Sequence, residues 1–176
     1  MRPSGYTLLE LLVALTVAAV LLSLGVPGLR ELALDARRTT DVNAFVSAIQ
    51  LARSESFKRS RAVVLCHTAD GAVCAGAREP YDIGWMVFVD LDEDNPPRRD
   101  DSEELLLHYL PVTEGSIRSN RAHYVFRPYY RRSTNGTVVF CDIRGPAAAR
   151  AVIVSYTGRP RVAATTAAGG SLSCAN

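Results

Sequence analysis

An uncharged apolar stretch near the N-terminus constrains the fold more than any other feature of this sequence. The 19 residues from Leu11 to Leu29 carry no charged side chain. As a helix, a run of this length is long enough to cross the hydrocarbon core of a bilayer. One acid, Glu10, stands at the edge of the run, where a carboxylate is costly and marks a candidate functional residue. We therefore expect the chain to begin with a membrane-spanning helix.

The helical pattern continues beyond this stretch, over residues 30–61. Apolar residues recur there at spacings of three, four and seven, which places them on one face of a helix. This face carries Leu34, Val42, Phe45, Ile49 and Ala52, and the opposite face carries Arg37, Arg38, Asp41, Arg53 and Lys58. Pro27 is expected to kink or loosen the helix locally because it lacks a backbone donor. The amphipathic half must pack against another element.

Strand-like segments follow, separated by turn signals. They lie at residues 62–66, 84–90, 104–110, 122–128, 137–142 and 149–156. The sequence STNGT, residues 133–137, is a strong hairpin signal between two of these segments. The predicted fold class is α+β, with a long N-terminal helix packed on an antiparallel β-sheet.

Charge is distributed unevenly along the chain, although the formal net charge is only +2. Residues 66–117 carry 3 basic and 12 acidic side chains, whereas residues 118–176 carry 9 arginines and one acid, Asp142. Such segregation indicates an anionic partner for the basic part. Attraction between the two parts within the fold is the alternative explanation.

The four cysteines form no Cys-x-x-Cys pair, which argues against a structural zinc site. Disulfides fit better if the domain lies outside the cytosol, and three pairings are possible. We favour Cys66–Cys74, which closes a short loop, together with Cys141–Cys174, which ties the C-terminal tail to a strand.

Motifs for catalysis are missing from the sequence. The three histidines share no pattern with a nucleophile, and no phosphate-binding glycine loop occurs. Asp90, Asp92 and Asp94 alternate as in the start of a calcium loop, but Asn95 replaces the expected glycine. A solvated hairpin tip is the favoured interpretation, and calcium binding is the alternative. We predict no enzymatic activity, no cofactor and no metal.

The N-terminal sequence SGYTLLELLVAL closely resembles the class III signal of type IV pilins and type II secretion pseudopilins. The resemblance implies that a prepilin peptidase cuts between Gly5 and Tyr6 and that Tyr6 is then N-methylated. It also implies that Glu10 pairs with the N-terminal amine of a neighbouring subunit and sets the register of filament assembly. A cleaved secretory signal and a plain single-span anchor are the alternatives.

Three further segments, ARSESFKRSRAVVLC, GWMVFVDLDED and FCDIRGPAAARAVIVSYTGRPRV, resemble the FimT/GspH group of minor pilins and pseudopilins. The likeness extends over nearly the whole chain and is strongest to FimT pilins. Some FimT pilins bind DNA during natural transformation and carry a Gly-Arg-x-Arg motif near the C-terminus. The sequence GRPR at residues 158–161 matches that motif. The resemblance implies that Arg159 and Arg161 contact DNA.

The residues of this motif suit the role physically. Gly158 permits a turn, and Pro160 favours an extended backbone at Arg159. Arg159 and Arg161 would then point the same way and bind phosphates as a two-pronged fork. Further candidates for a basic surface are Arg127, Arg131, Arg132, Arg144 and Arg150. For these five, a surface or intramolecular role is the alternative.

The sequence predicts a minor type IV pilin that binds double-stranded DNA without sequence preference during DNA uptake. The alternative is a structural minor pilin or secretion pseudopilin, similar to GspH or FimU, that primes filament assembly. Partners would include other pilins, prepilin peptidase and the inner membrane, with a periplasmic domain that later joins the pilus. The expected segments are a leader (1–5), a membrane helix (6–29), an amphipathic helix (30–61) and a β-rich domain (62–176) with a tail (157–176).

Overall fold

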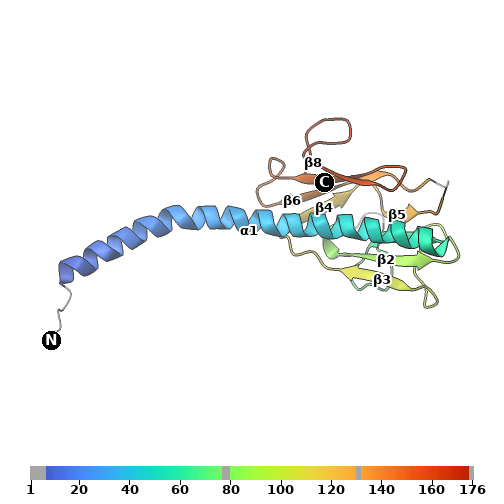
Figure 1. Ribbon diagram of the computed structural model, residues 1–176, viewed down its shortest axis with the longest axis horizontal. Coiled ribbons are helices and arrows are strands. Elements are labelled where there is room, and N and C mark those ends of the chain that lie inside the picture. Colours follow the sequence, from blue (N-terminus) through green and yellow to red (C-terminus); the bar gives the residue numbers. More distant parts are fainter. Residues whose placement is uncertain (1–6, 77–79, 130–131, 175–176) are drawn as a thin grey trace. The chain divides into compact units, whose positions relative to one another are not determined.

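The computed structural model describes residues 7–76, 80–129 and 132–174. One long helix, α1 (Leu8–Arg59), precedes a short 3₁₀ helix, η1 (Tyr81–Ile83), and eight strands (Figure 1). The strands are β1 (Ala62–His67), β2 (Trp85–Asp90), β3 (Leu105–Tyr109), β4 (Gly115–Ser119), β5 (His123–Phe126), β6 (Gly136–Asp142), β7 (Arg150–Val154) and β8 (Pro160–Ala163). Contacts divide the chain into two compact units, Met1–Ala36 and Arg37–Asn176.

The first unit consists of the N-terminal part of α1. The helix continues through residue 27 without interruption, so the proline there does not end it. Large apolar side chains are exposed along this part, among them Leu8, Leu21 and Leu29. Among the described residues, α1 is the one helix long and apolar enough to cross a membrane.

The second unit has two antiparallel sheets, whereas the sequence pattern suggested one. Their strand orders are β3-β2-β1-β5 and β4-β6-β7-β8. In Figure 1, β6 and β8 lie above the C-terminal half of α1, and β2 and β3 lie below it. The predicted α+β class and the antiparallel pairing are confirmed. Strands β4 and β8 were not predicted.

Phe45 on α1 occupies the centre of the core. It is fully buried and meets four rings nearly edge-on, which is a favourable geometry for aromatic pairs. The centroid distances are 5.8 Å to Tyr81, 5.2 Å to Trp85, 6.3 Å to Tyr124 and 5.7 Å to Phe140. Because these rings come from η1, β2, β5 and β6, one side chain connects the helix to both sheets.

Two charged residues of α1 that were expected on its solvent face are buried. Asp41 is inaccessible and accepts hydrogen bonds from the Tyr109 hydroxyl at 2.9 Å and from the backbone of Val112 and Thr113. Arg38 is 5% exposed and lies 3.6 Å from the Asp142 carboxylate. The helix therefore buries a wider face than its apolar stripe, because polar partners on the sheets satisfy these charges.

The hairpin predicted at STNGT does not form. Strand β5 pairs with β1 in one sheet, and β6 pairs with β4 and β7 in the other, so this segment crosses between sheets. Gly136 serves close packing rather than a turn: a Cβ there would lie 2.8 Å from the Tyr124 hydroxyl. The Asn-Gly pair was therefore misread as a two-residue turn.

Both favoured disulfides are present. Cys66 and Cys74 close a short loop after β1, and Cys174 joins the C-terminal tail to Cys141 in β6. Leu172, just before Cys174, is buried beside this second disulfide. The end of the described chain is thus held against the β4-β6-β7-β8 sheet.

The acidic segment forms the connection between β2 and β3. Carboxylate oxygens of Asp90, Asp92 and Glu103 lie within 4.8 Å of one another, and Asp94 is not part of this group. Both Glu103 oxygens accept backbone N–H groups, from Leu91 at 2.7 Å and from Asp100 at 3.2 Å. These carboxylates therefore hold the backbone of the connection in place.

Asp90 is the buried member of the group, with 2% of its surface exposed. Burial raises the pKa of Asp90 to about 6, and the neighbouring carboxylates act in the same direction. In the unfolded chain the same group ionises near pH 4. The folded protein therefore holds this proton over a pH range in which the unfolded chain releases it.

We predict that Phe45→Leu lowers the free energy of unfolding by about 1–3 kcal/mol, because it removes four ring contacts from the core. Urea unfolding of the unit that begins at Arg37 would measure the change. Phe57→Leu is the matched control, because Phe57 is 39% exposed. An equal loss for both variants would contradict the central role of Phe45.

A second prediction concerns pH. The Asp90 contribution to stability is greatest below pH 4 and is lost as the pH rises through about 6, because ionisation is unfavourable in the folded state. Asp90→Asn should remove this loss and stabilise the unit by about 1–3 kcal/mol at pH 7. Urea unfolding from pH 4 to 7 would test it, with the exposed Asp92→Asn as control. A constant difference between wild type and Asp90→Asn across this range would refute the prediction.

Candidate nucleic-acid interface

The GRPR residues lie at the tight turn between β7 and β8, not on a loose tail. The Gly158 N–H donates to the Ser155 carbonyl at 2.9 Å, and the Ser155 N–H donates to the Arg159 carbonyl at 3.1 Å. Gly158 has a φ of +70°, and a Cβ there would lie 3.0 Å from the Phe126 ring. Glycine is thus required both by the left-handed backbone and by the close approach of β5.

Pro160 begins β8, an edge strand of its sheet, where a missing N–H is tolerated. The side chains of Arg159 and Arg161 are exposed on either side of it. Arg161 lies within β8, whereas Arg159 precedes the strand and lines the cavities described below, of which Arg161 lines neither. Among the described residues, neither guanidinium forms an ion pair. Both arginines are thus attached to a hydrogen-bonded hairpin, and the two-pronged fork stays a prediction.

A cavity of about 360 Å³ opens beside this turn. Three distant parts of the chain line it: the end of α1, the connection between β5 and β6, and the β7–β8 turn. The lining residues are Arg53 and Phe57, then Arg127, Tyr129, Arg132 and Ser133, then Tyr156, Thr157 and Arg159. We call this cavity the arginine hollow. No acidic residue is among those that line it.

An adjoining cavity of about 530 Å³ follows α1 away from the arginine hollow. We call it the helix groove; it is lined by Val46, Gln50, Arg53, Ser54, Phe57, Arg159, Pro160 and Val162. Arg53, Phe57 and Arg159 line both cavities. These three residues therefore form the boundary between two neighbouring depressions.

Within the arginine hollow, cations and rings are paired. The Arg53 guanidinium lies 5.7 Å from the centre of the Phe57 ring, and that of Arg132 lies 5.5 Å from the Tyr156 ring. Tyr129 meets Phe57 edge-on at 6.0 Å. Cation–π contacts of this kind hold long arginine side chains in place without neutralising their charge.

The structure brings together only some of the sequence-predicted arginines. Arg127, Arg132 and Arg159 line the arginine hollow. Arg127 also has an acidic neighbour, with its Nε 3.9 Å from a Glu93 carboxylate oxygen. Arg131 lies outside the described residues.

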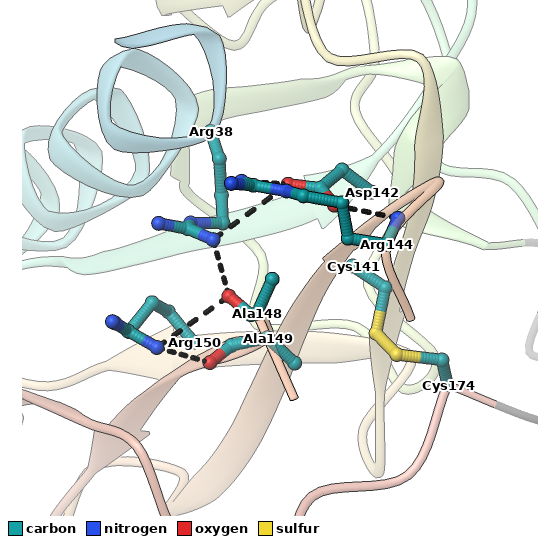
Figure 2. Close-up of polar contacts among 8 residues, drawn as sticks. All are labelled: Arg38, Cys141, Asp142, Arg144, Ala148, Ala149, Arg150 and Cys174. Carbon is teal, nitrogen blue, oxygen red and sulfur yellow. Dashed lines mark hydrogen bonds and ion pairs between the residues drawn. A yellow bond between two sulfur atoms is a disulfide. The ribbon is translucent and has the colours of Figure 1, made fainter. Parts of the chain in front are cut away.

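Arg144 and Arg150 lie elsewhere, in a polar cluster near the Cys141–Cys174 disulfide (Figure 2). Arg144 binds Asp142 through two nitrogens, at 3.0 Å and 2.6 Å. This contact lowers the pKa of Asp142. Arg150 donates to the Ala149 carbonyl at 2.8 Å. Arg144 is thus paired with an acid, whereas Arg150 donates to neutral carbonyls, and neither arginine lines the arginine hollow.

Several lining residues of the arginine hollow were missed by the sequence analysis as part of a site, among them Arg53 and Phe57. Arg53 was placed on the solvent face of the helix, and Phe57 was not considered. Both belong to the last two turns of α1, four residues apart and on one face. An arginine followed four residues later by an exposed aromatic is a signal that could have found them.

Glu10 lies at the start of α1. Its backbone N–H donates to the Thr7 hydroxyl at 3.3 Å, and the Thr7 N–H donates to its carboxylate at 3.2 Å. This reciprocal pair is a capping box, which satisfies two donors at the N-terminus of the helix. The predicted cleavage and methylation positions, Gly5 and Tyr6, lie outside the described residues.

Two family profiles match the chain. Residues 41–158 match type II transport protein GspH, and residues 1–26 match the prokaryotic N-terminal methylation motif. The first match spans more than half of the chain and ends at Gly158, so Arg159 and Arg161 lie just beyond it. Among curated proteins, none matches this sequence.

Two crystal structures of the type IV minor pilin FimU from Pseudomonas aeruginosa strain PAO1 share the fold. They align with TM-scores of 0.53 and 0.55 at 17% identity, and each alignment covers 98% of the FimU chain. The alignments cover 78% and 83% of the present chain. The family and the fold are those of pilins, which are structural proteins that associate in filaments. The chain thus belongs to the GspH family of type II transport proteins, as a minor pilin or pseudopilin with an N-terminal methylation motif.

Proposed function

We propose that this chain is a minor type IV pilin that binds the phosphate backbone of DNA during natural transformation. The observation that carries the proposal is the exposure of Arg159 and Arg161 on the rigid β7–β8 hairpin. A hairpin that is already ordered loses little conformational freedom on binding. Arginine also suits phosphate because its planar group donates two parallel hydrogen bonds.

The surroundings of the hairpin support the same function. Arg53, Arg127 and Arg132 line the arginine hollow with Arg159, so positive charge is concentrated at one end of the second unit. A concentrated positive field raises the association rate of a polyanion. The resemblance of GRPR to the motif of DNA-binding FimT pilins agrees with this arrangement.

Binding through phosphate contacts is largely independent of sequence, which DNA uptake requires. The small number of contacts on one subunit implies weak affinity that falls with salt. In a filament, neighbouring subunits would raise the overall affinity through avidity. In this proposal the anchored chain first exposes its domain in the periplasm and then joins a pilus.

A second function, priming of filament assembly, is favoured by the N-terminal part of α1. Its large apolar side chains are exposed over several turns, as expected for a helix that packs against lipid and then against other pilins. In this proposal Glu10 exchanges its partner Thr7 for the N-terminal amine of a neighbouring subunit. Assembly and DNA binding use different ends of the chain, so both can operate in one protein.

We predict that Arg159→Ala/Arg161→Ala weakens binding to a mixed-sequence duplex at least tenfold at low salt. The slope of log affinity against log salt should become shallower by about 2, since each phosphate contact contributes about 0.9. Fluorescence anisotropy of a labelled duplex, with the full chain in a neutral detergent, would measure both.

The matched control is Arg98→Ala/Arg99→Ala, which removes the same charge from the β2–β3 connection. It should leave the duplex affinity within about twofold of wild type and reduce the salt slope far less. Equal losses for the two double variants would show a general charge effect and would contradict a phosphate clamp at the hairpin.

A separate prediction concerns assembly. Glu10→Ala should remove the chain from sheared filaments while leaving it in the membrane fraction, because the apolar anchor is intact. Immunoblots of the two fractions would measure this, with Glu31→Ala as a control of equal charge. Normal incorporation of Glu10→Ala would count against the proposed pairing with a neighbouring amine.

A further inference from the structure

We propose that the arginine hollow is a nucleobase pocket, which receives an unstacked base from a single strand or a frayed end of DNA. This inference rests on the proposed DNA binding, because Arg159 belongs both to the GRPR motif and to the arginine hollow. It adds a second kind of contact, base stacking, and a preference for single-stranded or frayed DNA.

The aromatic rings that line the arginine hollow are unusually exposed. Phe57, Tyr129 and Tyr156 are 39%, 63% and 56% exposed, and all three line the same cavity. Aromatic side chains normally bury most of their surface in the core, as Phe45 does here. Three exposed rings around one cavity leave apolar surface that a flat, apolar ligand would cover.

Guanidinium groups lie beside these rings and suit both a base and its phosphate. Arg53 and Arg132 lie over the Phe57 and Tyr156 rings, and Arg127 and Arg159 add two further cations. Rings and guanidinium planes are the two side-chain surfaces on which unpaired bases stack. The same guanidinium groups can bind the phosphate attached to the base. A ligand that is both flat and anionic therefore matches this lining.

Size and access support a single nucleotide. The volume of about 360 Å³ lies near the lower end of small-ligand sites, which run from roughly 300 to 1,000 Å³. In an intact duplex the faces of the bases cover one another, so a base can enter a pocket only after it leaves the stack. The arginine hollow therefore favours a strand end, a gap or a single strand over the interior of a duplex.

The helix groove offers a path for the rest of the strand. It adjoins the arginine hollow along α1, and Arg53 and Arg159 line both cavities. Arg161, in β8, is exposed but lines neither cavity. Phosphates on either side of an inserted base would thus meet Arg159 and Arg53.

The test compares three labelled probes by fluorescence anisotropy, with the full chain in a neutral detergent. The probes are a 12-nucleotide mixed-sequence single strand, the same strand without bases, and a blunt duplex of equal length. Wild type should bind the single strand at least tenfold more tightly than the abasic strand, because stacking is lost in the latter. Equal affinities for these two strands would overturn the proposal.

Variants of the exposed rings separate the nucleobase pocket from the phosphate clamp. Tyr129→Ala/Tyr156→Ala should weaken single-strand binding about tenfold or more and change duplex binding less than twofold. Tyr156→Phe keeps the ring and should bind the single strand as wild type does. Arg159→Ala/Arg161→Ala should weaken both probes. A Tyr129→Ala/Tyr156→Ala variant that binds all three probes as wild type does would overturn the proposal.

The remaining outcomes separate the nucleobase pocket from the proposed DNA binding. Duplex binding without any effect of bases or rings would overturn the nucleobase pocket and leave the proposed function standing. No binding of any probe at low salt would overturn both. A decaglutamate peptide that displaces the single strand from wild type as effectively as unlabelled strand would identify a general anion site and overturn the nucleobase pocket.

Discussion

The burial of Phe45 is the contact on which the rest of the second unit depends. Its ring meets rings from η1 and from both sheets, so the C-terminal half of α1 cannot shift without opening all of these contacts. Asp41, one turn earlier, adds hydrogen bonds to the chain that follows β3. The helix is thereby fixed both along its axis and in rotation about it. Both sheets therefore pack against one face of this helix and share one core cluster with it.

This fixed helix determines where the candidate interface lies. Arg53 and Phe57 follow Phe45 by eight and twelve residues, so their positions at the end of α1 are set by the buried ring. The β7–β8 turn is held independently, since Gly158 packs on Phe126, which belongs to the same core. The arginine hollow is therefore built between two elements that are each anchored in the core. Binding there would require little rearrangement of the backbone.

The sequence predicted the helix, the antiparallel α+β class and both disulfides, because these depend on local periodicity and on cysteine number. It failed where the outcome depends on distant partners. Asn135–Gly136 has the composition of a hairpin turn, yet Gly136 is needed because Tyr124 and Asn120 approach it closely. From the sequence, Asp41 was expected to face solvent, because the three groups that donate hydrogen bonds to it lie about 70 residues away. The motif GRPR could be found in the sequence, whereas the cavity beside it joins residues that are more than 100 positions apart.

The ion pairs show which parts of the chain neutralise the acidic middle segment. Attraction between the acidic middle and the basic last third would have left no free positive surface. In the part of the chain that the structure describes, acids of the middle segment pair mainly with α1 instead, as in Arg59–Glu104 at 2.6 Å and Arg37–Glu114 at 3.0 Å. Arg127–Glu93, at 3.9 Å, joins the middle segment to the last third. Since α1 neutralises acids that would otherwise compete, arginines of the last third such as Arg132, Arg159 and Arg161 remain available to an external polyanion, and salt would screen that attraction more than it would weaken the fold.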